Sequence, residues 1–423
     1  MEHISEILNL LNKSYSPYHV ISNIEGELKK NKHIELKETN DFALEEGKSY
    51  YVKRNDSSLI AFSLPKNSPK GFLFTASHSD SPTFKVKPNP IYKVNNLAML
   101  NVEPYGGAIY YSWLDKPLSI AGRLFVKTKE GLESRLLYID ENLLIIPSLA
   151  IHMNREVNKS ASFNAAKDMI PMLGISKEGF SFKDYLKAKT GLKEDEEILS
   201  FDLSVVNREK ALLGGINKEF VYSPRLDDLG SVYTSLLGYL ESDPNDYIKV
   251  HAVFDNEEVG SLTRQGANST FLKDIVKRIL VKYQNNQTLL PNSFMLSIDN
   301  GHANHPNHPE YSDITTKVNL NGGVVIKYNA NQKYTTDSYS ASYIKLLAEE
   351  NNLSVQEYSN RSDLPGGSTL GNISNSELSL ATADIGLPQL AMHSSYEVTG
   401  KNDLEDIISL VKAFYNSSLP YKK

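Results

Sequence analysis

The sequence predicts an α/β protein in which a mixed, largely parallel sheet is flanked by helices and interrupted by an inserted, mostly β module. Three observations predict this class. Beyond residue 220, strand-like runs alternate with helices of ten or more residues, which is typical of a parallel sheet covered on both faces. The middle of the chain carries many short strand-like runs instead. With 423 residues, the chain is also longer than one hydrophobic core normally organises.

Two short helices and three strands are predicted at the start of the chain. Apolar residues from Ile4 to Leu11 recur at the spacing of one helical face, and the pattern resumes at Val20, beyond Pro17. The period then shortens to that of strands. Three such runs lie at residues 50–53, 58–62 and 71–76. The last run leads to His78, so a histidine stands where a buried strand ends.

The middle of the chain, residues 88–218, is predicted to form an inserted module of mostly β structure. It holds many short strand-like runs, such as 107–111, and few long helical patterns. None of the clusters of ligand-type residues described below falls inside it. We therefore expect one catalytic domain in two parts, residues 1–87 and 219–423, with the module between them.

The second part of the catalytic domain is predicted to alternate helices and strands. Helices are expected at residues 231–240, 262–283, 338–350 and 403–415, and strands at 248–254 and 293–298. Strands separated by helices of this length run parallel, because each helix returns the chain to the same edge of the sheet. Side chains that follow the strands therefore meet at one edge, where open α/β sheets bind ligands.

Composition excludes several classes of function. The chain has no cysteine, so it forms no disulfides and no thiolate metal sites, which agrees with a reducing cytoplasm. Its net charge of -6 comes without a basic block, which argues against nucleic acid as a partner. No stretch approaches the roughly 18 apolar residues of a membrane helix, and the first residues do not resemble a signal peptide. We expect a cytoplasmic protein without a membrane partner, acting on something small or peptidic.

Histidine and acidic residues collect where predicted strands or helices begin and end. The five places are His78-Ser79-Asp80, Asp227-Asp228, Glu257-Glu258, Asp299 and His393. Each alone has an ordinary explanation: a helix cap for an aspartate, an exposed turn for paired glutamates, a hydrogen-bonded core position for a histidine. Four strand ends that each present such a residue predict a shared site. Without cysteine, a metal there must be held by His, Asp and Glu.

The pair Glu257-Glu258 suggests hydrolysis of an amide. Near neutral pH this reaction needs an activated water, a Lewis acid on the carbonyl and a base, and two metals about 3.5 to 4 Å apart supply the first two. One glutamate can bind metal while its neighbour handles the proton. The pair Asp227-Asp228 exceeds what helix capping requires, and a carboxylate with two oxygens can bridge two metals.

Two loops are predicted to line the site. His302 lies with two further histidines among prolines, and such an irregular segment does not preset a metal site, so we assign His302 to the active-site lining. The run Gly366-Gly367-Ser368 lacks the lysine of a phosphate-binding loop. We expect Gly367 and Ser368 to offer backbone donors to a peptide or its oxyanion. No Gly-x-Ser-x-Gly motif supports a serine hydrolase.

Four longer motifs occur in order along the chain. They are His78-Ser79-Asp80-Ser81-Pro82, Pro224-Arg225-Leu226-Asp227, Asp255-Asn256-Glu257-Glu258-Val259-Gly260-Ser261 and Gln389-Leu390-Ala391-Met392-His393-Ser394. With them the chain closely resembles the M18 metallo-aminopeptidases, the aspartyl aminopeptidase family, over nearly its whole length. The resemblance implies a zinc-exopeptidase-like catalytic domain that hydrolyses the N-terminal residue from peptide substrates.

The resemblance implies two divalent metal ions held by five side chains. Asp227 would bridge the ions. His78 and Asp299 would complete the shell of one ion, and Glu258 and His393 that of the other. Zinc is the expected metal, with cobalt and manganese as alternatives, because the same ligands accept all three.

Further residues receive roles from the same resemblance. Glu257 would be the general base, and Asp80 would orient His78 without binding metal itself. Lys327 matches the lysine that meets the acidic side chain of the substrate's first residue, which predicts a preference for Asp or Glu by charge pairing. The alternative for Lys327 is an outward-facing position on an edge strand.

The resemblance also implies self-association. The inserted module would be a dimerisation domain, His152 would reach a neighbouring subunit's active site, and dimers would assemble into a dodecamer. Three residues depart from the usual family pattern and leave the substrate preference or the subunit contact open: Ser362, Gly366 and Tyr396. Two alternative functions follow. One is the same hydrolysis with a neutral or broad preference, and the other is a metal-bound assembly scaffold without catalysis.

Overall fold

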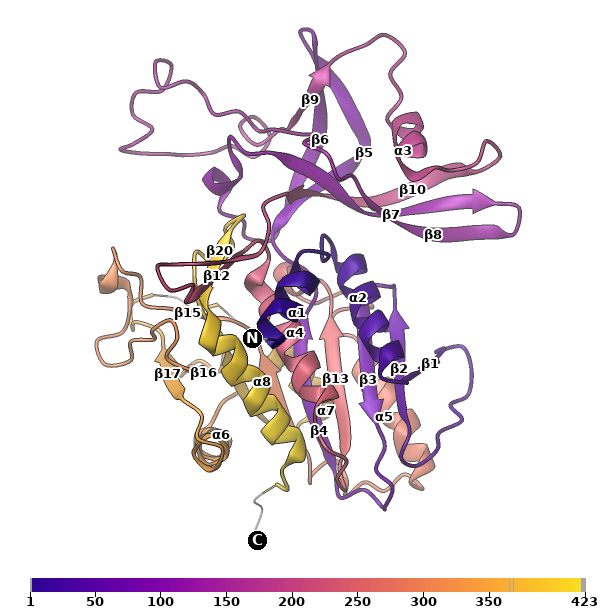
Figure 1. Cartoon of the computed structure of the whole chain (residues 1–423), viewed down its shortest axis with the longest axis vertical. Helices are drawn as coiled ribbons and strands as arrows, with labels where there is room; N and C mark the ends of the chain where they lie inside the picture. The colour runs from indigo at the N-terminus through magenta and orange to yellow at the C-terminus, as the bar shows by residue number, and fades with distance from the viewer. Residues whose placement is uncertain (1, 365, 368, 420–423) are drawn as a thin grey trace. The chain divides into compact units, whose positions relative to one another are not determined.

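The central sheet is built from strands that come from both ends of the chain. In the computed structural model, which describes residues 2–364, 366–367 and 369–419, its nine strands are β1 (Ile34–Leu36), β2 (Ser49–Arg54), β3 (Ser58–Ser63), β4 (Phe72–His78), β13 (Ile248–Phe254), β14 (Phe294–Ile298), β16 (Val324–Tyr328), β17 (Val355–Ser359) and β18 (Ala381–Gly386). Their order across the sheet is β1-β2-β3-β13-β4-β14-β18-β16-β17 (Figure 1).

Four parallel strands form the centre of this sheet. β13 pairs with β4, β4 with β14 and β14 with β18, all in parallel, whereas β3 and β16 run antiparallel to their inner neighbours. β4 and β13 are buried at every position, as expected of parallel strands covered on both faces. The mixed, largely parallel sheet predicted from the sequence is confirmed.

Helices cover both faces of the sheet. One face carries α1 (Glu2–Leu11), α2 (Pro17–Lys30), α4 (Leu226–Leu240), α6 (Ser338–Glu350) and α8 (Lys401–Asn416). The other carries α5 (Phe271–Lys282) and α7 (Leu370–Leu378). Each face has its own apolar core, and α4 and α8 pack side by side in front of the sheet (Figure 1).

The structure differs from the sequence prediction between residues 262 and 270. Helix was expected from residue 262, but α5 begins at Phe271. The preceding residues form turns, in which the N–H of Asn268 donates to the carbonyl of Ser261. A Cβ on Gly266 would lie 2.3 Å from that same carbonyl oxygen. The chain therefore folds back on itself here more closely than a helix permits, and the helical prediction for this segment was wrong.

A smaller five-stranded sheet lies beside the start of α4. Its strands, in spatial order, are β11 (Leu212–Gly214), β12 (Phe220–Ser223), β20 (Glu397–Gly400), β19 (Pro388–Leu390) and β15 (Gly301–His302). β12 pairs antiparallel with β20, with Ser223 opposite Glu397. The chain passes from β12 directly into α4, so this sheet fixes the point at which that helix begins.

The chain divides into two compact units. The first takes in the residues up to Asp80, Ala211–Met392 and the residues from Glu397 on, and the second takes in Ser81–Lys210 and His393–Tyr396. Both limits of the long insertion fall earlier in the chain than the expected limits at 87 and 218. The role of the insertion as a dimerisation domain stays a prediction.

The second unit is built on an antiparallel sheet. Its strands, in spatial order, are β8 (Gly131–Tyr138), β7 (Leu118–Thr128), β10 (Glu197–Asn207), β5 (Thr83–Val94), β6 (Leu97–Tyr105) and β9 (Met172–Ile175), and it also contains the helix α3 (Phe182–Thr190). Phe84 and Trp113 meet edge to face in its core, with ring centroids 5.4 Å apart. In neither unit does any described helix have the length and apolar character needed to span a membrane.

Candidate metal centre

The predicted ligands of the first unit come together at the carboxyl ends of the parallel strands. His78 is the last residue of β4, and Asp299 follows directly on β14. Glu257 and Glu258 lie in a short 3-10 turn, η2 (Glu257–Val259), just after β13. Because β13 and β4 are parallel neighbours with Phe254 opposite His78, these side chains emerge at one edge of the sheet.

Asp227 and Asp228 reach the same place from the first turn of α4. Both have non-helical backbone angles. Arg225, which precedes the first helical residue Leu226, adopts a left-handed conformation with φ of 60°. Both aspartates are buried. Oδ2 of Asp228 accepts the backbone N–H of His78 at 3.1 Å, which ties the start of α4 to the end of β4.

The side chains gathered here suit a divalent metal. Within the described residues of the first unit, two groups place their ligand atoms within 4.8 Å of one another: His78-Asp227-Asp228-Asp299 and His78-Glu257-Glu258. Oδ1 of Asp228 is buried and has no hydrogen-bond partner among the described residues. Buried carboxylates are stable only beside cations or several donors, and imidazole with carboxylate is a ligand set that zinc accepts. The residues present therefore fit a zinc centre.

His78 is oriented with one particular nitrogen toward the carboxylates. Its Nδ1 donates to the backbone carbonyl of Asp80 at 3.1 Å, and the carboxylate of Asp80 lies 3.3 Å from the same nitrogen. Its Nε2 lies 3.5 Å from Oδ1 of Asp227. The proton on Nδ1 leaves the lone pair on Nε2, which is the tautomer that a metal ligand needs.

The carboxylate of Asp80 has a second task that the sequence did not predict. Its two oxygens accept the backbone N–H groups of Glu257 at 3.1 Å and Glu258 at 3.2 Å. Asp80 was expected to orient His78, and both its backbone carbonyl and its carboxylate lie close to Nδ1 of that ring. It also anchors the turn that carries both glutamates.

Electrostatics in the cluster are dominated by burial and by the closeness of like charges. Burial alone would lower the pKa of His78, but the carboxylates of Asp228 and Asp227 raise it well above its usual value. Burial raises the pKa of Glu257 to about 7, with Asp299 and Asp80 adding to the effect. The pKa of Asp299 is also raised, first by burial. A cation at this place would relieve all of these penalties.

Lys327 lies beside Asp299 in the interior. It stands on β16 with 1% of its surface exposed, so its side chain does not face outward from an edge strand. Its Nζ donates to the backbone carbonyl of Asp299 at 2.7 Å and lies 3.8 Å from the carboxylate of that residue. The ring of Tyr334 lies 5.1 Å from the ammonium. The lysine is therefore held next to the cluster by neutral and charged oxygens.

Two predicted histidines belong to the second unit. His152 is exposed in an irregular segment. His393 directly follows Met392, the last residue of this segment of the first unit. Its Nδ1 donates to the carbonyl of Gly107 at 3.2 Å, and its carbonyl accepts the N–H of Ile109 at 3.0 Å. As with His78, a backbone carbonyl fixes the proton on Nδ1.

Of the three residues predicted to line the active site, the structure describes His302 and Gly367. His302 is exposed and lines an open pocket of about 290 Å³ together with Tyr358, whose ring meets it edge to face. Gly367 is exposed, and a Cβ there would meet no atom within 4 Å. Ser368 lies outside the described residues. The roles of these three residues in substrate binding stay predictions.

One residue of the cluster was missed by the sequence analysis. Glu397 on β20 is 1% exposed, and its Oε2 accepts the backbone N–H of Asp227 at 3.1 Å. It holds the non-helical start of α4 from the side of the smaller sheet. Its only sequence signal is an acid at the start of a short strand-like run, and such a position is too common to identify alone.

Comparisons with known proteins identify the family of this chain. A family model described as aminopeptidase I zinc metalloprotease (M18) matches residues 10–415. A probable M18 family aminopeptidase 2 of Clostridium acetobutylicum is 42% identical over an alignment of 428 positions, which covers 98% of this chain and 99% of the relative. The Pseudomonas aeruginosa protein of the same name is 36% identical over an alignment of 420 positions, which covers 97% of each chain.

Solved structures give the same picture. A chain from the cryo-EM structure of the Ape4 and Nbr1 complex superposes with a TM-score of 0.94 at 35% identity, over 98% of this chain and 85% of that one. A chain of the S. cerevisiae mApe1 dodecamer superposes with a TM-score of 0.85 at 27% identity, over 97% of this chain and 96% of that one.

Proposed function

The chain belongs to the M18 family of zinc metallo-aminopeptidases, and on this premise we propose that it removes N-terminal Asp or Glu residues from peptides with two bound zinc ions. Enzymes of this family are metallo-exopeptidases, so hydrolysis of the N-terminal peptide bond follows from membership. The acidic preference, the pair of ions and Glu257 as general base are the further parts of the proposal.

One observation carries the proposal. His78 shares its surroundings with two groups of buried or half-buried acids whose ligand atoms lie within 4.8 Å of one another. Buried carboxylates that lie so close together repel each other unless cations neutralise their charge. We assign Asp227 as the bridge, His78 and Asp299 to one ion, and Glu258 to the other. The family resemblance adds His393 to the second ion.

The chemistry divides between the ions and one carboxylate. When bound, the two ions polarise the scissile carbonyl and lower the pKa of the attacking water. Glu257 is not among the assigned ligands, so it is left to take the proton from that water and deliver it to the leaving amine. Asp80 supports this role, because it holds the backbone N–H of Glu257 at 3.1 Å.

The proposed preference for acidic residues rests on Lys327. Its ammonium is buried, so an anionic side chain brought near it interacts far more strongly than it would in water. The one carboxylate within 4.0 Å of it among the described residues, that of Asp299, is the proposed ligand of an ion. A neutral or broad preference is the competing outcome, because Lys327 also donates a hydrogen bond to the backbone carbonyl of Asp299 and could have only this structural role.

Self-association is proposed on two grounds. One structural relative is a dodecamer. In the second unit, three large apolar side chains of one irregular segment are exposed: Leu149, Ile151 and Met153, at 60%, 48% and 75%. Neighbouring apolar side chains left in solvent mark an interface. We propose that this segment, which also carries His152, contacts another subunit.

The function is tested by hydrolysis of chromogenic amides of Asp, Glu, Leu and Lys by the zinc-loaded protein. We expect turnover of the Asp and Glu amides to exceed that of the Leu and Lys amides, and a chelator to abolish all of it. Equal rates on the four amides would leave an aminopeptidase of broad preference. No turnover of any amide with metal restored would favour the scaffold without catalysis.

A further inference from the structure

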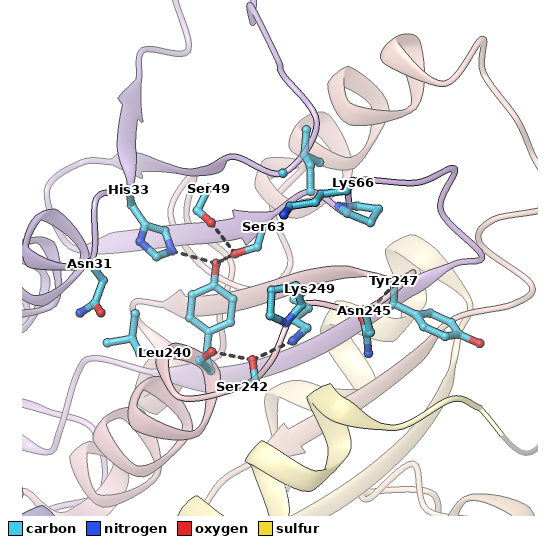
Figure 2. Close-up of a pocket in the computed structure, with 15 residues that line it drawn as sticks. Asn31, His33, Ser49, Ser63, Lys66, Leu240, Ser242, Asn245, Tyr247 and Lys249 are labelled. Atoms are coloured by element: carbon cyan, nitrogen blue, oxygen red, sulfur yellow. Dashed lines mark hydrogen bonds between the residues drawn. The ribbon is translucent and has the colours of Figure 1, made fainter.

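A second pocket lies at the opposite edge of the central sheet from the metal centre. Lys249, the second residue of β13, lines this pocket, and the same strand ends at the metal centre with Phe254. Five residues of strand separate the two places by roughly 16 Å. The pocket has a volume of about 200 Å³ and is formed within the first unit by the ends of α2 and α4 and the edges of β2, β3 and β13 (Figure 2).

The floor of the pocket is one row of residues across three strands. Ser49 on β2 pairs with Ser63 on β3, and Ser63 pairs with Lys249 on β13. Directly opposed residues of antiparallel strands point to the same face, so these three side chains stand side by side. The last turn of α4 contributes Tyr239, whose hydroxyl lies 2.7 Å from that of Ser63. Ser242, just beyond this helix, also lines the pocket (Figure 2).

Lys249 is a buried cation with only neutral partners. It is 4% exposed, and its Nζ donates to Oγ of Ser242 at 2.9 Å and to the backbone carbonyl of Asp243. No carboxylate oxygen of the described residues lies within 4.0 Å of this ammonium. The side chain of Asp243 is exposed and accepts a hydrogen bond from Asn416 at 3.1 Å instead.

The surroundings of Lys249 compensate its charge only in part. The C-terminus of α4, at Leu240, offers the partial negative charge of a helix end, which is about half an elementary charge. Burial lowers the pKa of Lys249 to about 8, with the more distant Asp243 opposing the shift, so the side chain still carries its proton at neutral pH. An ammonium has three N–H donors, and two of them have partners. One donor and the uncompensated part of the positive charge remain for a ligand.

The other walls define the size and kind of that ligand. A chain of hydroxyl groups runs from Ser49 to Ser63 at 2.8 Å and on to Tyr239 at 2.7 Å. Its end on Tyr239 is closed by Nε2 of His33 at 3.1 Å. Leu64 and Leu240 add apolar surface to the lining of the pocket. We propose that this pocket binds a small monocarboxylate, with the carboxylate on Lys249 and the hydroxyl row and its short aliphatic part against the two leucines.

A monocarboxylate suits the pocket better than a phosphate group. The pocket offers a single buried cation, which balances one negative charge, whereas a phosphate dianion needs several charged donors. Lys66 also lines the pocket, but it is exposed, and a water-screened charge adds little.

The proposal is tested by titrating butyrate into the zinc-loaded, full-length protein in a calorimeter, with butyramide as the uncharged ligand of the same shape. We expect butyrate to bind about tenfold or more tightly than butyramide, because the amide keeps an acceptor oxygen for Lys249 but loses the negative charge that pairs with its ammonium. Lys249→Met should weaken butyrate by the same factor. The matched control is Lys277→Met, which changes an exposed lysine on α5 and should leave binding unchanged.

The two lysine variants also separate this pocket from the metal centre. Butyrate bound by the zinc ions would still bind to Lys249→Met. Only the part of the butyrate binding that this variant loses therefore belongs to the pocket. Should Lys249→Met fail to fold, Leu240→Phe narrows the pocket without touching the charge and should weaken butyrate as well. The proposal is overturned if butyramide binds as tightly as butyrate, if inorganic phosphate binds more tightly, or if no component of butyrate binding depends on Lys249 or Leu240.

Discussion

The carboxylate of Asp80 holds the backbone N–H of Glu257 at 3.1 Å, so the residue after β4 fixes the residue proposed to move protons after β13. The second oxygen of Asp80 holds Glu258 in the same way at 3.2 Å. Two neighbouring strands are thereby joined at their ends by a single side chain. This arrangement explains how a short, half-buried turn keeps two glutamates in a fixed position.

Asp80→Asn should separate positioning from metal binding. An asparagine presents one acceptor oxygen, and its amide N–H groups would face the backbone N–H of Glu257 or Glu258, so the turn must shift. We expect kcat to fall roughly 10- to 100-fold, as for other residues that orient metal-site groups, with zinc content retained. Amide hydrolysis and metal analysis by mass spectrometry measure the two quantities. Asp41→Asn, at an exposed position, is the control, and wild-type kcat in Asp80→Asn would contradict the role.

Glu257→Gln should abolish proton transfer and leave the ions in place. A glutamine keeps the size of the side chain but accepts no proton at neutral pH. We expect kcat to fall by about 10²- to 10⁴-fold with both ions bound. Glu258→Gln is the matched comparison, because loss of a ligand should reduce the metal content itself. If Glu257→Gln hydrolyses amides at the wild-type rate, another group is the base.

Metal removal should destabilise the fold as well as stop the reaction. Without cations, the buried carboxylates of Asp227, Asp228 and Asp299 repel each other, and a ligand that binds only the folded state stabilises it. We expect the melting temperature to fall on chelation and to recover when zinc is added back. Differential scanning calorimetry measures both steps. An unchanged melting temperature would show that the carboxylates are protonated or otherwise satisfied in the metal-free protein.

Lys327→Ala should change the substrate preference more than the overall rate. Loss of the ammonium removes the charge proposed to meet an acidic side chain, and it also removes the donor to the carbonyl of Asp299. We therefore expect kcat/KM to fall on all amides and to fall further on Asp and Glu amides than on Leu amides. The ratio between substrates is the measurement, so a general loss cancels. Equal losses on every amide would assign Lys327 to the support of Asp299 alone.

His3→Gln should remove part of the pH dependence of stability. Nδ1 of His3 lies 2.8 Å from Glu405 and Nε2 lies 2.6 Å from Glu241, so both nitrogens donate only in the protonated ring, and these carboxylates raise its pKa above 6.5 against a smaller effect of burial. The stabilisation is therefore complete below the unfolded pKa of about 6.5 and is lost as pH rises through the higher folded value.

The measurement for His3→Gln is the melting temperature at about pH 6 and about pH 8.5, on either side of the ordinary histidine range. The wild type should gain more stability than the variant on going to the lower pH. His305→Gln, at an exposed histidine, is the control and should follow the wild type. The same pH dependence in His3→Gln and the wild type would rule out this ion pair as its source.

The sequence was sufficient where periodicity and strand ends determine the structure. β4 and β13 are mainly apolar, so their burial and the place of His78 at one end could be predicted. The parallel order of the central strands followed from the helices between them. The edge at which His78, Glu257 and Asp299 meet is a consequence of that order.

The sequence was insufficient where a backbone group is held by a distant side chain. Glu397 reaches the N–H of Asp227 across 170 positions, and Asp228 reaches the N–H of His78 across 150 positions. Such bonds depend on the exact approach of two elements, which periodicity does not encode. The turns before α5 were missed for a related reason, because the close approach at Gly266 involves two backbone segments.

The order of the ligands along the polypeptide also sets the order of events during synthesis. The ribosome releases His78 early, but the next proposed ligand, Asp227, emerges only after the whole inserted unit, and Asp299 only after the 298 residues before it. Until then at most three of the five proposed ligands, His78, Asp227 and Glu258, have emerged, and Asp299 and His393 are still missing. Loading with metal is thus a closing step of biogenesis, and truncated translation products should emerge empty.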